Sequence, residues 1–363
     1  MNTSLTREQA LELSTLPLPQ LTAGAGRLRE AAFGRKVDLC AIINARSGNC
    51  AMDCRFCSQS RHNSTPIEVF DFLPDDVLRA RILTLAALPV GHIGIVTSGA
   101  ALGGEEFTRL CALLAALPED VRRRVCVSLG RLADRQFDDL VRAGVRRYHH
   151  NLETAKSLYP SICTTQTWAQ RRDTVLRAIR AGLQACTGGL FGMGETWRER
   201  IDFAFSLKEL GVCHIPLNFL HPHPQTPLAG QEPLAADEAL RIIAVFRHIL
   251  PEATLRVCGG RPLILGGRQH EIFAAGANAM LTGGYLTTKQ GQGVDEDMDM
   301  LSAQGLEAAG AGGARLESSA PSEEIRRLGQ RMTLEAASMP RSAGVADVRM
   351  SRVAAASTVS ARP

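Results

Sequence analysis

Three cysteines lie close together in the sequence, at Cys50, Cys54 and Cys57, in the pattern CxxxCxxC. Thiolates are soft ligands that suit iron–sulfur clusters or zinc. Three thiolates at this spacing leave one iron of a four-iron cluster without a protein ligand from the local sequence. The stretch therefore predicts an iron–sulfur cluster with one iron free to bind a small molecule.

A structural zinc site is the alternative use of the same three thiolates. Such a site normally completes its tetrahedron with a fourth protein ligand. The sequence offers no second CxxC pair at a suitable distance. Because structural zinc sites are closed and this one is open, the cluster is the preferred interpretation.

The elements that position these cysteines are short apolar strands alternating with helical segments. The first expected strand, 37–44, directly precedes the cysteine loop. The other strands are expected at 93–99, 124–130, 147–152, 184–191, 214–220, 254–259 and 279–283. Eight strand–helix units close a parallel barrel, and polar or glycine-rich residues follow most strands, as a ring of active-site loops requires. We therefore expect a (β/α)8 barrel of the TIM type; a doubly wound open sheet is the alternative.

Three regions follow from this pattern. Residues 1–36 form a helical lead-in, with helices expected to begin at Thr6 and to cover 28–33. The barrel covers 37–306. Residues 307–363 are rich in Ala, Gly, Ser and Arg with few large apolar residues, so we expect a disordered tail, at most locally helical around 322–337.

The bulk composition excludes several classes of protein. Of 363 residues, 45% are hydrophobic and 21% are charged, which is normal for a soluble globular protein. The formal charge of +4 indicates neither nucleic acid nor an acidic membrane as a main partner. The sequence begins without a secretory signal pattern and has no apolar run long enough to span a membrane. Ten cysteines with a dense cluster favour a reducing compartment, so we expect a cytoplasmic protein.

The CxxxCxxC motif after a first barrel strand resembles the signature of radical S-adenosylmethionine enzymes. In that superfamily the three cysteines hold a 4Fe–4S cluster, and the amino and carboxylate groups of S-adenosylmethionine bind the fourth iron. An electron from the cluster then cleaves the cofactor to methionine and a 5'-deoxyadenosyl radical. This radical abstracts hydrogen from an unactivated carbon.

Five stretches, which span most of the expected barrel, resemble the biotin synthase family in the same order. They are CRFCSQS at 54–60, YHHNLET at 148–154, GGLFGMGET at 188–196, IPLN at 215–218 and GAN at 276–278. The resemblance implies conversion of dethiobiotin to biotin by radical-mediated sulfur insertion. It also implies an auxiliary iron–sulfur cluster as the sulfur source, an electron donor such as flavodoxin or ferredoxin, and a homodimer.

The resemblance assigns four residues to the substrate. Asn151 and Asn218 follow two strands and are implied to contact the cyclic urea of dethiobiotin, since an amide offers both a donor and an acceptor. A plain structural use of each asparagine, as a turn or strand cap, is the alternative. Thr287 and Thr288 match the family's threonine pair near the substrate carboxylate.

Four further residues are assigned to S-adenosylmethionine by the same resemblance. Glu153 stands where the family typically has Asp and is implied to contact the ribose. Arg171 matches an arginine that pairs with the methionine carboxylate, a bond that guanidinium geometry favours; a solvated helix charge is the alternative. Gly188 and Gly189 allow a backbone to approach a ligand closely.

The auxiliary cluster of the best-known family members is a 2Fe–2S cluster bound by three cysteines and an arginine. Cys126, Cys186 and Arg256 fall on matching positions, whereas Thr97 is assigned to the place of the remaining cysteine. A hydroxyl is a much poorer ligand than a thiolate. The site is therefore expected to differ from that pattern.

Two additional cysteines are candidates for the auxiliary site. Cys40 lies on the first strand, where the family usually has serine, and Cys258 follows Arg256 by two residues on the same strand face. The Thr-Ser-Gly stretch at 97–99 resembles a family branch, mainly from anaerobes, with an altered and larger auxiliary cluster. We expect Cys40, Cys126 and Cys186 to hold this cluster, with Cys258 or Arg256 nearby; Cys111, Cys163 and Cys213 are expected to be structural.

Two alternative functions remain open at this point. One is a radical enzyme of the same barrel class that rearranges or methylates its substrate or assembles a metal cofactor, which Thr97 supports and the paired Cys126 and Cys186 oppose. The other is a non-enzymatic iron–sulfur or zinc carrier, or a redox-sensing protein. A carrier would have no reason to arrange asparagine and threonine around a barrel mouth.

Overall fold

A computed structural model describes residues 5–284 and 293–310. Its strands form one closed parallel barrel in the order β1–β2–β3–β4–β5–β7–β8–β9, and β9 pairs back onto β1. The strands are β1 (Lys36–Arg46), β2 (His92–Thr97), β3 (Val125–Ser128), β4 (Arg147–His149), β5 (Gln184–Cys186), β6 (Gly189–Phe191), β7 (His214–Phe219), β8 (Thr254–Val257) and β9 (Ala279–Leu281). The TIM-type barrel is confirmed, and the open sheet is excluded because its edges are joined.

The fifth strand differs from the single segment expected at 184–191. It is divided into β5 and β6, and both pieces pair with β7. The break falls at Thr187 and Gly188. A Cβ atom on Gly188 would lie 1.8 Å from the carbonyl oxygen of Pro216, so this position requires glycine for the close approach of the two backbones.

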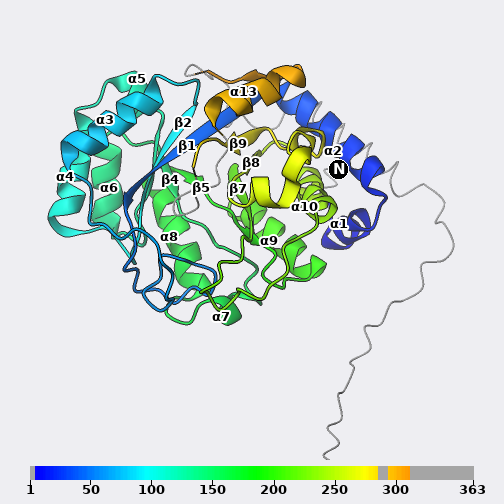
Figure 1. Ribbon diagram of the computed structural model, residues 1–363, viewed down its shortest axis with the longest axis horizontal. Coiled ribbons are helices and arrows are strands. Elements are labelled where there is room, and N and C mark those ends of the chain that lie inside the picture. Colours follow the sequence, from blue (N-terminus) through cyan, green and yellow to red (C-terminus); the bar gives the residue numbers. More distant parts are fainter. Residues whose placement is uncertain (1–4, 285–292, 311–363) are drawn as a thin grey trace, which may run out of the picture.

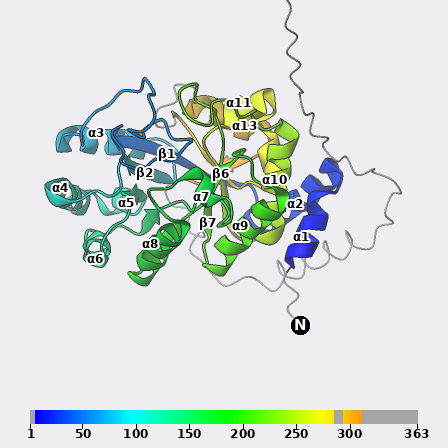
Figure 2. The ribbon, with the colours of Figure 1, turned by 90° about the horizontal axis from the view of Figure 1, so that it is seen from below.

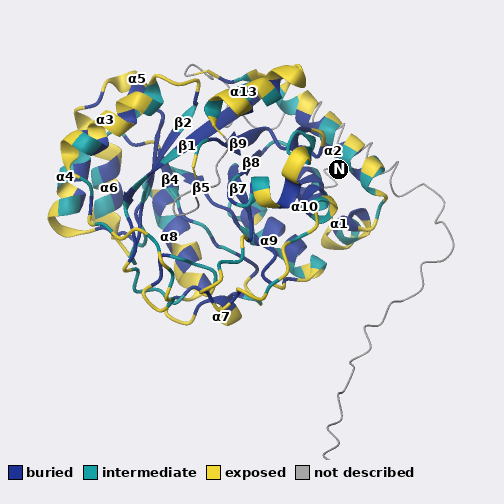
Figure 3. Ribbon diagram, viewed as in Figure 1, coloured by how far each residue is buried: buried dark blue, intermediate teal, exposed yellow. Residues whose placement is uncertain are grey.

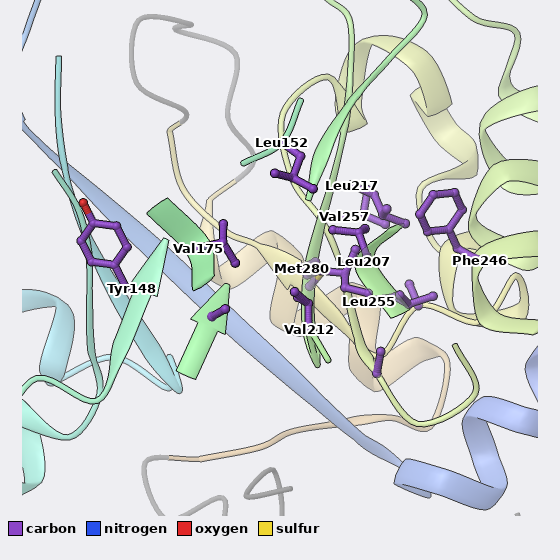
Figure 4. Close-up of a cluster of buried hydrophobic side chains, with 14 of the residues drawn as sticks. Tyr148, Leu152, Val175, Leu207, Val212, Leu217, Phe246, Leu255, Val257 and Met280 are labelled. Carbon is purple, nitrogen blue, oxygen red and sulfur yellow. The ribbon is translucent and has the colours of Figure 1, made fainter. Parts of the chain in front are cut away.

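Helices surround the barrel and turn their exposed faces outward (Figure 1, Figure 3). They are α1 (Arg7–Ser14), α2 (Leu18–Phe33), α3 (Asp75–Ala86), α4 (Gly104–Ala115), α5 (Glu119–Arg122), α6 (Asp134–Arg142), α7 (Tyr159–Ile162), α8 (Trp168–Arg180), α9 (Trp197–Glu209), α10 (Ala236–Ile249), α11 (Arg261–Leu265), α12 (Glu271–Ala274) and α13 (Val294–Ala303), with a short 3-10 turn at Gly266–Arg268. The layer between strands and helices is apolar. Figure 4 shows Leu217 and Val257 from β7 and β8 near Phe246 of α10.

The two N-terminal helices lie beside α9 and α10 on the outside of the barrel (Figure 2). Helix α1 begins after Thr6, whose hydroxyl accepts from the Gln9 amide in a capping box, as expected. Helix α2 is longer than the segment predicted at 28–33. Its Pro19 lies in the first turn, where proline costs no helical hydrogen bond, so the helix starts at Leu18.

The barrel region extends slightly beyond the boundary expected at residue 306. A two-residue strand, β10 (Glu307–Ala308), pairs in parallel with Lys36 and Val37 at the start of β1. The Glu307 carboxylate also lies 3.8 Å from the side-chain nitrogens of Arg35 and Lys36. The segment considered for local helix, 322–337, lies outside the described residues. Within the described part of the chain, no helix is long and apolar enough to cross a membrane.

Candidate active site

A cavity of about 520 Å³ opens at the carboxyl ends of the strands, and we call it the outer cavity. Its lining includes all three cysteines of the motif, Cys50, Cys54 and Cys57. The carboxyl ends of parallel strands meet at one rim of a barrel, and TIM-barrel enzymes have their active sites at this rim. The outer cavity is large enough for a drug-sized ligand.

The cysteine loop is held in a fixed shape by hydrogen bonds to its own backbone. The Asn63 amide donates to the carbonyl oxygens of Cys54 and Cys57 at 3.3 and 2.8 Å, and the Cys50 amide donates to the Gln59 carbonyl at 3.0 Å. In residues 5–284 and 293–310, no three His, Cys, Asp or Glu side chains gather closely enough to hold one metal ion.

Asp53, inside the motif, ties this loop to the segment that precedes α8. Its carboxylate accepts from the backbone amides of Thr164 and Thr165 at 2.9 and 3.1 Å, and from both threonine hydroxyls. The Cys163 thiol also donates to it, at 3.1 Å. Burial alone would raise the pKa of Asp53, but these hydrogen bonds hold it well below its usual value. Sequence reasoning missed Asp53 because its partners are distant in the chain.

Arg171 lies inside the site rather than in solvent. Its Nη1 donates to the Asn151 carbonyl at 2.9 Å and lies 3.2 Å from Glu153 Oε1, while its Nε donates to the Tyr159 hydroxyl at 2.7 Å. Its Nη2 lies 4.0 Å from Cys54 Sγ. Glu153 adopts a left-handed backbone conformation with φ of +69°, which is uncommon for a non-glycine residue. Arg171 and Glu153 therefore form a fixed pair beside the cysteine loop.

Asn151 and Asn218 both line the outer cavity and also brace its wall. Asn151 Oδ1 accepts from the Gly188 amide at 3.1 Å. Asn218 Oδ1 accepts from the Gly259 amide at 3.0 Å, and its Nδ2 donates to the Gly189 carbonyl at 3.1 Å. Each amide can still make further bonds, since the group has two donors and two acceptor sites. Thr287 and Thr288 lie outside the described residues.

Gly188 and Gly189 are required by the barrel itself. A Cβ on Gly188 would meet Pro216, as described above, and one on Gly189 would lie 2.3 Å from the Glu153 carbonyl oxygen. Neither glycine lines the outer cavity. Their small size therefore allows two strands and the Glu153 turn to approach one another.

A second cavity of about 100 Å³, the inner cavity, lies deeper in the barrel. Its lining includes Arg256 and four cysteines, Cys40, Cys126, Cys186 and Cys258. The two cavities share part of their lining and therefore adjoin each other. The residues that line both are Val96, Ser128, His149 and Asn218. His149, which also hydrogen-bonds with Cys186, was missed although it stands in the 148–154 stretch. Alternation along β4 could have placed it inside the barrel.

The barrel interior shifts the pKa values of the inner thiols in different directions. Burial raises the pKa of Cys40 to about 11, and it raises the pKa of Cys258 further. Cys126 and Cys186 hydrogen-bond with each other, and this bond raises the pKa of Cys126 and lowers that of Cys186. Metal binding stabilises thiolates and releases their protons, so these groups suit metal ligation more than acid–base chemistry.

The assignment of Thr97 to the missing ligand position is wrong. Thr97 lines the outer cavity, where its hydroxyl donates to the Ser128 carbonyl at 3.4 Å. Gly94 is the residue of β2 in register with Cys126, and it lines the inner cavity. A Cβ on Gly94 would lie 2.9 Å from Cγ2 of Ile42, so the Ile42 side chain takes that space. Three residues along a strand displace a side chain by about 10 Å.

Comparison with known families agrees with this geometry. The Radical SAM superfamily matches residues 45–207, and the Biotin and Thiamin Synthesis associated domain matches residues 216–307. A parallel barrel with the three cysteines at its mouth thus defines a radical S-adenosylmethionine enzyme.

The chain is 66% identical over 299 residues to the biotin synthase of Desulfovibrio desulfuricans, covering 82% of this chain and 94% of that one. It is 44% identical over 314 residues to the biotin synthase of Nitratidesulfovibrio vulgaris, covering 83% and 86%. The chain belongs to the biotin synthase family.

Solved structures support the fold alone. Methylornithine synthase has a TM-score of 0.73 at 18% identity, over 85% of this chain and 95% of that chain. The FeFe-hydrogenase maturase HydG from Carboxydothermus hydrogenoformans has a TM-score of 0.69 at 17% identity, over 92% and 86%. At such low sequence identity, the structural similarity gives no information about the reaction.

Proposed function

We propose that the two adjoining cavities carry the two halves of the biotin synthase reaction, in which dethiobiotin receives sulfur and becomes biotin. The observation that carries this proposal is the shared wall. His149 and Asn218 line both the outer cavity, with its CxxxCxxC cysteines, and the inner cavity, with four more cysteines. A radical formed on one side of this wall would stand next to a sulfur source on the other.

Cys50, Cys54 and Cys57 would hold the 4Fe–4S cluster, and all three line the outer cavity. When bound, this cluster and S-adenosylmethionine supply the radical that removes hydrogen, and an auxiliary cluster supplies the sulfur. The chain itself contributes position and exclusion of water. The Asp53 contacts hold the loop against the segment before α8, which keeps the thiols facing the cavity.

Arg171 and Glu153 would bind S-adenosylmethionine. The Arg171 guanidinium lies 4.0 Å from Cys54 Sγ, so it would stand beside a cluster bound by Cys54 and could pair there with the methionine carboxylate. Glu153 is held by Arg171 and by Asn151 Nδ2 at 3.3 Å, so its carboxylate is pre-oriented for a ribose hydroxyl. Gly188 and Gly189 would contribute to the S-adenosylmethionine site indirectly, because their small size allows the Glu153 turn and β7 to pack closely against this segment.

Asn151 and Asn218 would bind the cyclic urea of dethiobiotin with their remaining donors and acceptors. Their bonds to barrel backbone fix the orientation of both amides before the substrate arrives, which lowers the entropy cost of binding. We assign Thr287 and Thr288 to the substrate carboxylate by resemblance alone.

Cys40, Cys126 and Cys186 would hold the auxiliary cluster, with Cys258 close by. All four line the inner cavity, and Cys126 and Cys186 are already in contact. The altered cluster of the anaerobic branch is proposed here because β2 presents Gly94 instead of a cysteine to this cavity.

The proposal extends to the partners and the location of the protein. All ten cysteines are free, which agrees with a reducing, cytoplasmic location. The exposed Arg55 and Arg61 near the cluster loop would complement an acidic electron donor such as flavodoxin or ferredoxin. A homodimer is proposed from the family resemblance, and light scattering tests it.

An anaerobic assay with dethiobiotin, S-adenosylmethionine and a reductant, read by mass for biotin, tests the function. We expect biotin from the wild type and from Cys111→Ala, whose side chain lines neither cavity, and none from Cys54→Ala. Deoxyadenosine release without biotin, unaffected by dethiobiotin, would instead favour rearrangement or cofactor assembly. The named relatives do not favour that alternative.

A further inference from the structure

The Thr-Ser-Gly stretch at 97–99 lines the outer cavity, and none of its three residues lines the inner cavity. It lies where β2 ends, beside the residues that lead from β1 into the cysteine loop. We propose that Ser98 is a positioning residue for Cys50, because with Arg46 it holds the chain that enters the loop. The stretch thus serves the cluster of the CxxxCxxC motif and not the auxiliary cluster. The inference rests on the proposed function, since it requires that Cys50 binds the first cluster.

Hydrogen bonds join Ser98 to the chain just before the cysteine loop. The Ser98 amide donates to the Arg46 carbonyl at 3.0 Å, and Arg46 Nε donates back to the Ser98 carbonyl at 3.0 Å. The Ser98 hydroxyl donates to the Gly48 carbonyl at 2.6 Å. Ser98 is buried, and a hydrogen bond is electrostatically stronger in the protein interior than in water. The bonds therefore fix the chain at two points, Arg46 and Gly48, directly before Cys50.

The backbone between these points and Cys50 needs such support. Gly48 and Asn49 both have left-handed backbone conformations, with φ of +77° and +52°. This conformation costs free energy at a non-glycine residue such as Asn49 and persists only where the surrounding structure holds it. The bond from the Ser98 hydroxyl is one such contact, and the bond from the Gly48 amide to Gln59 Oε1 at 3.1 Å is another. Because Cys50 is the next residue, the direction of its side chain depends on this turn.

An irregularity in the strand pairing brings Arg46 to Ser98. The register of β1 against β2 shifts by one residue after Asn44, so that Arg46 is paired with Thr97. A bulge of this kind changes the direction of the side chains that follow it, and bulges are common next to active sites. Arg46 Nη1 also donates to Glu106 Oε2 of α4 at 2.8 Å, which holds the guanidinium from the other side.

The other two residues of the stretch have matching uses. Gly99 has a φ of +108°, and a Cβ atom there would lie 2.6 Å from Arg46 Nη2. Glycine is therefore required by the backbone conformation and by the position of the guanidinium. The Thr97 hydroxyl donates to the Ser128 carbonyl at 3.4 Å, which joins the stretch to β3. All three residues thus hold the stretch in place at the outer cavity.

Loss of the Ser98 hydroxyl is therefore expected to weaken the hold on Cys50. The Gly48 carbonyl loses this donor, and the left-handed turn at Asn49 loses one of its two supports. A cysteine that is held less firmly at its iron allows faster loss of the cluster. The auxiliary cluster should not respond, since Ser98 does not line the inner cavity.

The test follows each cluster separately in full-length protein reconstituted under anaerobic conditions. Cys126→Ala with Cys186→Ala leaves only the cluster of the motif, and changing the three motif cysteines to Ala leaves only the auxiliary cluster. An iron chelator is added to each protein, and the release of iron is followed by absorbance. We expect Ser98→Ala to speed release roughly 5-fold in the first background, as for one lost hydrogen bond, and to leave it unchanged in the second. Arg46→Ala, which removes the other side-chain donor, should act in the same direction.

A matched control and a spectroscopic readout separate positioning from general stability. Ser206→Ala removes a hydroxyl that donates to the Asp202 carbonyl at 2.8 Å within α9, and it should release iron at the wild-type rate in both backgrounds. The EPR spectrum of the reduced motif cluster should change in Ser98→Ala, whereas the circular dichroism spectrum should not. A variant that merely destabilises the barrel would speed iron release from both clusters.

Three results would overturn the inference. They are wild-type release rates in Ser98→Ala, faster release from the auxiliary cluster alone, and equal acceleration in both backgrounds. If the wild-type protein binds no cluster at the motif, the proposed function fails together with this inference. If the wild type holds both clusters and forms biotin while Ser98→Ala releases iron normally, the inference alone is wrong.

Discussion

Arg171 on α8 approaches Cys54 of the cysteine loop, with 4.0 Å between Nη2 and Sγ, while its Nη1 lies 3.2 Å from Glu153. One side chain thus connects the helix after the barrel's fourth strand, the turn at Glu153 and a thiol of the motif. Since Tyr159 accepts from its Nε at 2.7 Å, the guanidinium is held before any ligand binds. Pre-organisation of this kind lowers the cost of binding a carboxylate.

Replacing Arg171 by Ala is expected to weaken S-adenosylmethionine binding roughly 10- to 100-fold, because hydrogen bonds to charged groups contribute about 1.5–3 kcal/mol. Anaerobic calorimetry on reconstituted protein measures this. The exposed neighbour Arg172→Ala is the matched control and should bind normally. Equal affinities in both variants would exclude Arg171 from the cofactor site.

Asp53→Asn is expected to lower the free energy of unfolding by about 1–3 kcal/mol at neutral pH, since the loop loses charge-assisted hydrogen bonds from Thr164 and Thr165. The pKa of Asp53 is depressed in the folded protein, so its contribution is complete above the unfolded pKa of about 4 and is lost as the pH falls below it. Urea unfolding of the cluster-free protein at several pH values measures this. The difference from wild type should shrink in acid, and the exposed control Asp71→Asn should show no such trend.

Cys126→Ala and Cys186→Ala are expected to lose the iron and sulfide of the auxiliary cluster while retaining those of the first cluster. The reason is that both thiols line the inner cavity and neither lines the outer one. Iron and sulfide analysis after anaerobic reconstitution provides the count. Cys213→Ala, which lines neither cavity, serves as the control, and wild-type counts in all three variants would be incompatible with the proposed ligands.

Gly188→Ala is expected to destabilise the barrel by about 1–3 kcal/mol or more, because overpacking forces the backbone to shift. The new Cβ would lie 1.8 Å from the Pro216 carbonyl oxygen. Thermal unfolding of the cluster-free protein measures the loss. Gly230→Ala, which places its Cβ in open space, should unfold at nearly the wild-type temperature; a similar result for Gly188→Ala would refute the close approach.

The barrel could be predicted from sequence because each strand is a short apolar run followed by polar or glycine residues. The cysteine motif could be recognised equally well, since its three cysteines lie within eight residues of the chain. The contacts that bind the site together were not predictable in this way. Asp53 meets Thr164, and Asp38 meets Arg256, only after the barrel has closed.

The auxiliary site shows the same limit at finer scale. The Thr-Ser-Gly motif predicts Thr97 at the ligand position, whereas the register of β2 with Cys126 places Gly94 there. Register between neighbouring strands depends on packing across the whole barrel. A motif fixes neither the direction nor the depth of a side chain.

The pairing of β1 with β9 and β10 also has a consequence for synthesis on the ribosome. The strand that leads into the cysteine loop emerges early, but its partners Ala279 and Glu307 emerge only after most of the chain has been made. Contacts so distant in sequence form late. The barrel behind the cysteine loop is therefore expected to close only after residues 279–308 have emerged from the ribosome.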